Sequence, residues 1–207
     1  MDIPVTPLDK RFRGYLPVII DIETAGFNPK KHALLEIAAV IVELNSKHEL
    51  EITERYSTHV IPFKNAEFDE AALKFNGIDP HHPFRMAVDE KEALDMLFKP
   101  IKEAVKRNNC TRAILVGHNP AFDINFLNAA IHRTQIKRSP FHPFSTFDTA
   151  TLGGLAYQQT VLAKIAKTAG LEWDNEKAHS ALYDAEKTAE LFCKIVNRWK
   201  RLEALDT

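Results

Sequence analysis

Four carboxylates stand inside apolar stretches of this chain, and they constrain its fold more than any other feature of the sequence. Asp21 and Glu23 interrupt the run VIIDIET, Asp123 ends the segment HNPAFD, and Asp184 ends the segment HSALYD. A carboxylate in apolar surroundings is costly unless it is paired or bound to a metal ion. The sequence therefore favours a fold in which these three distant segments converge around a cation.

Length and composition indicate one folded domain, spanning residues 1–207. The chain has 207 residues, of which 45% are apolar, so it can bury a full core. Its net charge of −1 argues against a protein that coats duplex DNA, although a local basic groove is compatible with it. The first ten residues, MDIPVTPLDK, contain no signal-peptide pattern, and no apolar run approaches the roughly 18 residues of a membrane span. Cys110 and Cys193 lack the spacing of a metal site and are expected to be reduced thiols. Together these features lead us to expect a cytoplasmic protein without membrane contact.

The hydrophobic pattern predicts an α/β fold with a mixed sheet. Short β-branched and apolar runs predict strands at residues 18–23, 34–44, 51–62, 113–116 and 146–149. Helical spacing predicts helices at residues 89–107 and 180–199, with a short helix within residues 64–85. Two further helices are expected, one capped by Asn119 with Pro120 at its first position, and one capped by Thr160 and ended by Gly170. The last helix should bury Ala181, Ala185, Thr188, Phe192, Ile195, Val196 and Trp199.

These elements aim the carboxylates at the interior or at a cleft in it. Asp21 and Glu23 are two residues apart on a strand, so both point to one face. Such neighbours repel each other, and one would take up a proton unless a cation lay between them. Asp123 lies on the inward side of its helix, and Asp184 lies at the edge of the buried stripe. Ligation by carboxylates alone favours hard cations such as Mg²⁺ or Mn²⁺.

Such a site suits the hydrolysis of a phosphodiester. Two ions roughly 3.5–4 Å apart can stabilise both the attacking and the leaving oxygen. His179 stands five residues before Asp184, just outside the expected helix. A neutral imidazole can take a proton from the attacking water. A lone loop histidine more often has no such role, but the acidic context favours a general base here.

Three motifs resemble those of a known family. DIETAG, from Asp21 to Gly26, resembles the first motif of the DEDD 3′–5′ exonucleases, and HNPAFD resembles the second. HSALYD resembles the third motif in the histidine-bearing DEDDh branch. Within that branch the chain is similar to the ribonuclease T family at residues 73–80, 140–144, 146–149 and 192–201. The resemblance implies a ribonuclease-H-like fold, with a mixed five-stranded sheet and flanking helices.

The resemblance also implies a function. The family trims the 3′ ends of transfer RNA and other stable RNAs, degrades single-stranded DNA ends, releases 5′-mononucleotides and forms homodimers. Carried over by position, the ligands of two Mg²⁺ ions, which Mn²⁺ can replace, are Asp21, Glu23, Asp123 and Asp184. By the same comparison His179 is the general base.

The family binds its substrate through aromatic and basic residues. Its aromatic wedges, which stack on the last bases, correspond to Phe27, Phe75, Phe122 and Phe144. Core packing is the alternative for each, and it is weakest for Phe27, which follows Gly26 in a turn. The family's nucleic-acid-binding patch serves the other subunit's active site and corresponds to Arg11, Arg13, Lys106, Arg112 and Lys137. Solvated surface charge is the alternative for these five residues.

One position departs from the family, and two other functions stay open. The family's glutamate that contacts the terminal bases aligns with Ala71, while Glu70 is the neighbouring residue. A shift of one residue on a helix turns a side chain by about 100°, so that contact is not carried over. The two alternatives to an exoribonuclease are a DNA 3′–5′ exonuclease for proofreading or repair and a non-catalytic nucleic-acid-binding domain. Intact ligands and base argue against the latter, so we expect a metal-dependent 3′–5′ exoribonuclease.

Overall fold

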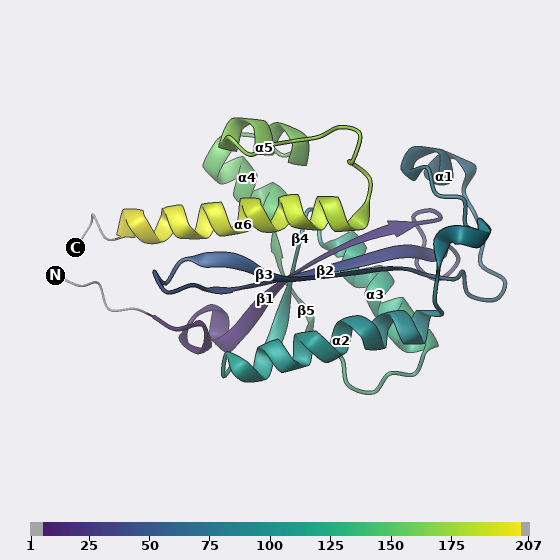
Figure 1. The fold of residues 1–207 in the computed structure, drawn as a ribbon, viewed down its shortest axis with the longest axis horizontal. Helices are drawn as coiled ribbons and strands as arrows, with labels where there is room; N and C mark the ends of the chain where they lie inside the picture. The colour runs from purple at the N-terminus through teal and green to yellow at the C-terminus, as the bar shows by residue number, and fades with distance from the viewer. Residues whose placement is uncertain (1–5, 204–207) are drawn as a thin grey trace.

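A mixed five-stranded sheet forms the centre of the computed structural model, which describes residues 6–203 (Figure 1). The strands are β1 (Tyr15–Thr24), β2 (Leu34–Leu44), β3 (Leu50–His59), β4 (Arg112–Gly117) and β5 (Phe141–Asp148), in the order β3-β2-β1-β4-β5. β2 runs antiparallel to β1 and β3, whereas β4 runs parallel to β1 and β5. The predicted mixed sheet is therefore confirmed, although β5 begins earlier than expected.

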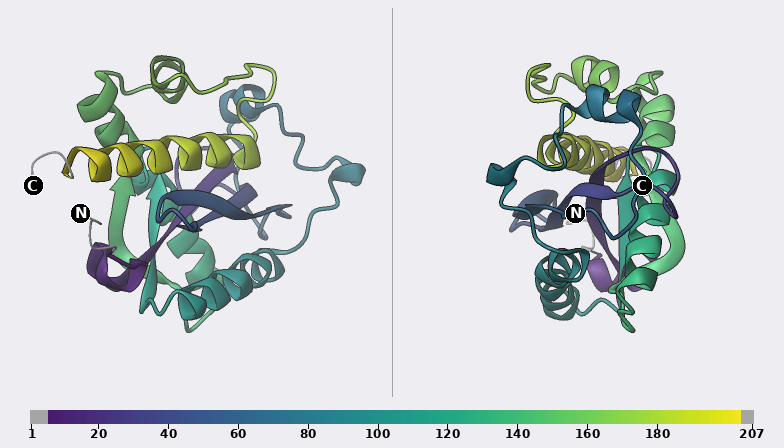
Figure 2. Two further views of the ribbon diagram at one scale, coloured as in Figure 1. Left: turned by 60° about the vertical axis from the view of Figure 1, so that its left-hand side comes forward. Right: turned by 90° about the vertical axis from the view of Figure 1, so that its right-hand side faces the viewer.

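Six α-helices flank the sheet within the described residues. They are α1 (Glu70–Asn76), α2 (Glu90–Arg107), α3 (Ala121–Arg133), α4 (Thr149–Tyr157), α5 (Leu162–Ala169) and α6 (Ala181–Glu203). Short 3-10 segments lie at Leu8–Lys10, Phe12–Gly14 and Pro83–Arg85. α6 follows one face of the sheet with α4 and α5 on its outer side, while α2 follows the other face (Figures 1 and 2).

Burial on both faces explains the apolar sequence of β2. Its first nine residues are buried, since α6 and α2 contact it from opposite sides. β3, at the edge, is buried only at Leu50 and then alternates between exposed and half-buried positions. Ala181, Ala185 and Ala189 are fully buried on α6, so small side chains let this helix approach the sheet closely.

The predicted side-chain caps of α3 and α5, Asn119 and Thr160, are wrong. The backbone of each residue makes a hydrogen bond to another part of the chain instead. α3 begins after Pro120 and has no side-chain cap. Asn119 adopts a left-handed conformation (φ 63°), and its backbone N–H donates to Asp148 Oδ1 at 3.0 Å. α5 also lacks a side-chain cap, and the Thr160 carbonyl oxygen lies 3.0 Å from Nε2 of His118. The predicted end of α5 at Gly170 is correct.

The sequence pattern missed α4 and placed one residue of α6 wrongly. α4 follows β5 directly, and its glycine-containing sequence TATLGGLAY shows little helical periodicity. Trp199 was expected to be buried but is 55% exposed. α6 has reached the β2–β3 turn at this point, where Lys200 Nζ donates to His48 O at 2.9 Å. No helix within residues 6–203 is both long and apolar enough to cross a membrane.

Candidate active site

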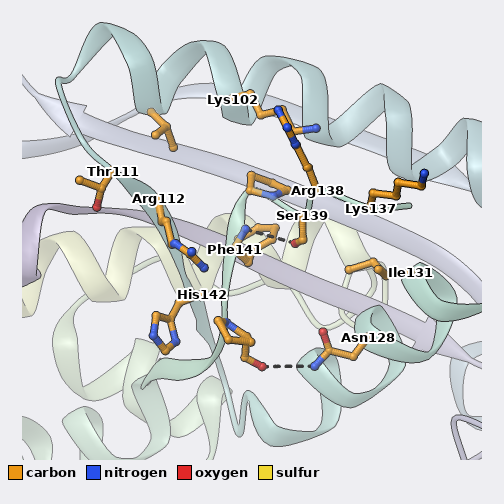
Figure 3. Close-up of a pocket in the computed structure, with 13 residues that line it drawn as sticks. Lys102, Thr111, Arg112, Asn128, Ile131, Lys137, Arg138, Ser139, Phe141 and His142 are labelled. Atoms are coloured by element: carbon orange, nitrogen blue, oxygen red, sulfur yellow. Dashed lines mark hydrogen bonds between the residues drawn. The ribbon is translucent and has the colours of Figure 1, made fainter. Parts of the chain in front are cut away.

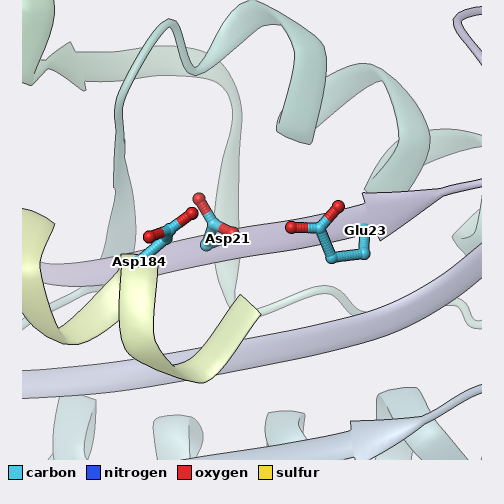
Figure 4. A group of neighbouring side chains, drawn as sticks. All are labelled: Asp21, Glu23 and Asp184. Carbon is cyan, nitrogen blue, oxygen red and sulfur yellow. The ribbon is translucent and has the colours of Figure 1, made fainter. Parts of the chain in front are cut away.

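Three carboxylates from two elements meet beside the sheet. Asp21 and Glu23 share one face of β1, and Asp184 projects from the first turn of α6 (Figure 4). One carboxylate oxygen of each residue lies within 4.8 Å of the others. Oxygen ligands this close together can share a divalent cation.

Asp123 lies beside this group without being part of it. It stands in the first turn of α3, is 5% exposed, and packs against Gly117 at the end of β4. A Cβ atom on residue 117 would lie 3.3 Å from Asp123 Oδ2 and 3.1 Å from Pro120 Cβ, so glycine leaves room for the carboxylate. We refer to Asp21, Glu23, Asp123 and Asp184 together as the carboxylate cluster.

Burial and mutual repulsion favour the protonated forms of the carboxylate cluster. Burial, followed by the charge of Asp184, raises the pKa of Glu23 to about 8. Burial raises the pKa of Asp123 to about 7. The pKa of Asp21 is raised well above its usual range by burial and then by the charge of Asp123. Asp184 Oδ1 is buried and has no hydrogen-bond partner among the described residues, so the cluster fits a bound cation.

His179 lies beside the cluster, two residues before α6 and outside the helix as predicted. Its backbone is left-handed (φ 67°), and its N–H donates to Asp184 Oδ2 at 3.1 Å. Its exposed ring lies 4.2 Å, between centroids, from the ring of Phe75 in α1. The preceding loop is tied to α6, because the Tyr183 hydroxyl accepts the Asp174 N–H at 2.6 Å.

Aromatic rings line a pocket that includes part of the cluster. The pocket has a volume of about 390 Å³ and is lined by Asp21, Glu23 and Asp184 together with Phe27, Phe75 and Phe122. Phe27 and Phe75 are 78% and 67% exposed, which excludes core packing for them. Phe122 is half-buried, and its ring centroid lies 6.1 Å from that of Phe27. Such rings offer stacking surfaces to nucleobases.

Local contacts fix the backbone segments that carry the exposed rings of Phe27 and Phe75. Gly26, which precedes Phe27, has a φ of 148°, and a Cβ atom there would lie 2.3 Å from the ring of His32. Only glycine therefore fits this turn. In α1, Asn76 Nδ2 donates to Thr24 O at 3.0 Å, which ties the helix to the end of β1.

Ala71 and Phe144, two further positions compared with the family, differ in their relation to this pocket. Ala71 lines the aromatic pocket, whereas Glu70, the first residue of α1, does not. Unlike the other three predicted wedges, Phe144, which lies in β5, does not line this pocket. Phe144 is 78% exposed, so it is not a core residue, and its ring centroid lies 4.6 Å from that of His142.

The predicted basic residues lie on segments that lead into strands of the sheet. Arg11 and Arg13 precede β1, Lys106 lies in the last turn of α2, Arg112 is the first residue of β4, and Lys137 precedes β5. Arg112 and Lys137 line a pocket of about 500 Å³ together with Lys102 and Arg138 (Figure 3). Arg112 pairs with Tyr15, six residues before Asp21, which corresponds to roughly 20 Å along a strand. The structure therefore does not bring the five predicted basic residues, which we call the basic patch, to the carboxylate cluster of the same chain.

Two polar residues that support the site were not predicted. Glu36 is buried in β2, directly opposite Glu23. Asp148 accepts the Asn119 N–H and so holds the turn that precedes α3. Glu36 stands in the apolar run LLEIAAVIV, so the signal that identified Asp21 could have identified it too.

Comparisons with known proteins show a family relationship over most of the chain. The RNase_T family, described as exonuclease, matches residues 18–192. Proteins named ribonuclease T are 57% identical over 196 residues in Marinobacter nauticus and 59% identical over 196 residues in Vibrio vulnificus. These matches cover 95% and 94% of this chain, and 89% and 90% of those proteins.

Solved structures share the fold at low sequence identity. Exonuclease I of E. coli, in complex with a dT13 oligonucleotide, matches with a TM-score of 0.68 and 18% identity. The match covers 92% of this chain but 43% of exonuclease I, so this chain spans less than half of that protein. The nuclease domain of 3′hExo, a DEDDh family member bound to rAMP, matches with a TM-score of 0.66, 20% identity and coverage of 88% and 92%. These likenesses establish the ribonuclease-H-like fold.

Proposed function

Because the chain belongs to the ribonuclease T family of exonucleases, we propose that it is a 3′–5′ exoribonuclease that releases 5′-mononucleotides. The observation that carries the proposal is a carboxylate cluster next to a pocket with exposed aromatic walls. Carboxylates can hold the cations that assist phosphodiester hydrolysis, and aromatic rings can stack on the last bases.

The carboxylate cluster would hold two Mg²⁺ ions, which Mn²⁺ would replace. The raised pKa values of Asp21 and Glu23 and the unpartnered Oδ1 of Asp184 support this assignment. Asp123, with its carboxylate buried beside Gly117, would complete the ligands. When bound, the ions supply Lewis-acid stabilisation of the charge that develops on the attacking and leaving oxygens.

His179 is the proposed general base. Its imidazole takes a proton from the water whose oxygen attacks the phosphorus of the last phosphodiester. The bond between phosphorus and the 3′-oxygen of the preceding nucleotide breaks, and that oxygen takes up a proton from solvent. The products are a 5′-mononucleotide and an RNA that is one nucleotide shorter. The hydrogen bond from the His179 N–H to Asp184 Oδ2 keeps this base next to the proposed ligands.

The aromatic pocket would select unpaired 3′ ends. Phe27 and Phe75 can stack on a base only when that base has left its duplex. Ala71 adds no polar group to the pocket, so stacking rather than hydrogen bonding to base edges supplies the affinity at this position. Accordingly, the proposed substrates are the unpaired 3′ ends of transfer RNA and other stable RNAs in the cytoplasm, together with single-stranded DNA ends.

The basic patch would serve the active site of a second copy in a homodimer. Its distance from the cluster of the same chain supports this arrangement, because one terminal nucleotide cannot contact both. Complementation tests it. Asp21→Asn removes a proposed ligand in one chain, and a double replacement of Arg112 and Lys137 by Ala removes the patch in the other.

If the patch acts across the dimer, mixing the two inactive chains restores activity, to about a quarter of the wild-type rate, because about half of the dimers are mixed and each has one complete site. If the patch serves its own chain, mixing restores nothing. Oligomeric state, measured by light scattering, shows whether the chain forms dimers at all.

Substrate ends test the proposed direction of attack. A linear RNA with a free 3′-OH should be shortened one nucleotide at a time, whether or not its 5′ end is blocked. The same RNA with a 3′-phosphate or a fully paired 3′ end should resist. Cleavage of a circular RNA would contradict an exonuclease. Trimming of DNA ends with RNA ends left intact would favour a proofreading or repair enzyme instead.

A further inference from the structure

Arg133, the last residue of α3, joins three parts of the chain. Its Nε and Nη2 donate to the two carboxylate oxygens of Glu90, the first residue of α2, at 2.9 and 2.6 Å. Its Nη1 donates to the carbonyl oxygen of Pro29, in the turn between β1 and β2, at 2.7 Å. Its Cζ lies 4.1 Å from the ring centroid of Phe63. A planar guanidinium can bond all these partners at once, whereas the ammonium group of lysine cannot.

The ion pair between Arg133 and Glu90 is largely shielded from water. The two side chains are 21% and 7% exposed. Two parallel hydrogen bonds between a guanidinium and a carboxylate fix the orientation of both groups. The pair with Glu90 therefore also fixes the direction of the remaining N–H, which points at Pro29. None of the exonuclease motifs includes Arg133.

The turn that Arg133 contacts carries the exposed wedge Phe27. Pro29 stands two residues after Phe27. The carbonyl oxygen of Asn28, which lies between them, accepts the His32 N–H at 2.8 Å, and the Asn28 N–H donates to His32 Nδ1 at 2.9 Å. These bonds tie the residues of the turn to one another. A displacement of Pro29 would therefore also displace the backbone that carries the Phe27 ring.

α3 contacts this turn at both of its ends. In its first turn lies Phe122, whose ring centroid is 6.1 Å from that of Phe27. At its last residue, Arg133 donates to Pro29. The first turn of α3 also carries Asp123, a member of the carboxylate cluster. The bond from Arg133 thus fixes the wedge on the helix that carries a proposed metal ligand.

We propose that Arg133 is a positioning residue, which holds the turn after β1 on α3 and thereby sets the place of the Phe27 ring and the affinity for an unpaired 3′ end. Arg133 does not line the aromatic pocket, so it acts through the turn and not by contact with the terminal base. The inference rests on the proposed function in taking Phe27 as a stacking wedge.

A lysine variant tests the bond to Pro29. Arg133→Lys keeps the charge but cannot bond Glu90 and Pro29 together. Arg107→Lys is the matched control, since Arg107 is the last residue of α2 and makes a two-bond ion pair with Glu43, away from the turn. Glu90→Gln is a second control, because it removes the ion pair but leaves the guanidinium that donates to Pro29.

The measurement is the affinity of the full chain for a single-stranded RNA with a free 3′ end. Fluorescence anisotropy of a label on the 5′ end reports binding, and a chelator prevents hydrolysis during the titration. Circular dichroism verifies that each variant is folded at the temperature of the measurement. Arg133→Lys is also combined with Phe27→Ala and, separately, with Phe75→Ala, because residues that act through one another have non-additive effects.

We expect Arg133→Lys to weaken RNA binding by at least about fivefold on its own and in the Phe75→Ala background. In the Phe27→Ala background it should weaken binding by less than about twofold further, since the ring that it positions is already absent. Arg107→Lys and Glu90→Gln should bind within about twofold of wild type, even where their melting temperatures fall.

Three results would overturn the inference. The first is normal affinity of Arg133→Lys. The second is an undiminished effect of Arg133→Lys in the Phe27→Ala background, which would show that Arg133 acts independently of the wedge. The third is an equal loss of affinity in Arg107→Lys or Glu90→Gln, which would indicate general destabilisation.

A second pair of variants applies if Arg133→Lys fails to fold. Arg133→Met combined with Glu90→Gln removes both charges and the donor to Pro29, so no unpaired charge stays buried. Its reference is Glu90→Gln alone, and the same weakening of RNA binding is expected relative to that reference.

The outcome for the inference is separable from that for the proposed function. The binding assay contains no Mg²⁺, so the expected coupling without RNA hydrolysis after Mg²⁺ is added would contradict the proposed exonuclease alone. Normal RNA binding by Phe27→Ala would contradict both the stacking role of Phe27 and the role of Arg133.

Discussion

The backbone N–H of His179 donates to Asp184 Oδ2 at 3.1 Å, while Oδ1 of the same carboxylate is buried without a partner. One oxygen of Asp184 thus anchors the proposed base, and the other faces the proposed cations. The left-handed backbone of His179 (φ 67°) belongs to this arrangement, since it is an uncommon conformation for a residue with a side chain.

Removing a metal ligand should abolish hydrolysis while the fold persists. Asp21→Asn replaces the carboxylate whose pKa is raised well above its usual range by burial and the charge of Asp123. The neutral variant no longer repels its neighbours, so its metal-free melting temperature should not fall. Asp95→Asn, on the exposed side of α2, is the matched control. A rate above about a tenth of the wild-type value would count against the two-metal assignment.

Removing the base should slow turnover without loss of binding. His179→Ala should lower kcat by about 10²–10⁴-fold, the usual cost of losing a general base. Mg²⁺ and RNA affinities, measured by calorimetry and by filter binding, should stay close to wild type. Because the N–H of residue 179 is unchanged, the anchor to Asp184 persists. A variant with a normal kcat would show that another group accepts the proton.

Replacing an exposed wedge should weaken binding rather than stability. Phe27→Ala or Phe75→Ala should each weaken the binding of a single-stranded 3′ end by about 1–3 kcal/mol, the value of one base stack. Phe126→Ala is the contrast, because Phe126 is fully buried and its loss should lower the free energy of unfolding by about 3–5 kcal/mol. One thermal melt and one binding curve per variant decide between a role in binding and a role in stability. A large loss of stability with unchanged affinity would return Phe27 and Phe75 to a structural role.

Ionised Asp148 should stabilise the turn before α3 in a pH-dependent way. Burial alone would raise the pKa of Asp148. Hydrogen bonds from the Thr151 hydroxyl and the Asn119 N–H outweigh burial and lower this pKa. A depressed carboxyl pKa stabilises the fold above the unfolded value of about 3.9, and this stability is lost as pH falls through the folded value. Asp148→Asn should therefore cost about 1 kcal/mol at pH 7 and a smaller amount near pH 3, where only part of this stability remains. Urea melts at both pH values test this, and an equal cost at both would contradict it.

The sheet and the three converging carboxylates could be predicted because their signals are local. The apolar run of β2 reports burial on both faces, and the two-residue spacing of Asp21 and Glu23 reports a shared face. Asn119 could not be placed, because its left-handed backbone goes with a hydrogen bond from its N–H to Asp148, 29 residues further on. Phe144 lies outside the strand predicted at residues 146–149, whereas β5 begins at Phe141 and includes it.

The proposed role of the basic residues depends on a still longer-range property. Arg112 and Lys137 lie near each other only because β4 and β5 are parallel neighbours. Which active site they serve is a property of the assembly of chains, and no spacing within one chain encodes it.

Release of the terminal nucleotide as a function of Mg²⁺ tests the central claim most directly. RNA labelled on its last internucleotide phosphate is incubated with the wild-type chain, first with a chelator and then with an excess of Mg²⁺. The carboxylate cluster predicts no release with chelator, and a labelled 5′-mononucleotide as the first product once Mg²⁺ is added. Release in the presence of chelator, or a labelled oligonucleotide as the first product, would contradict metal-dependent 3′–5′ exonuclease action.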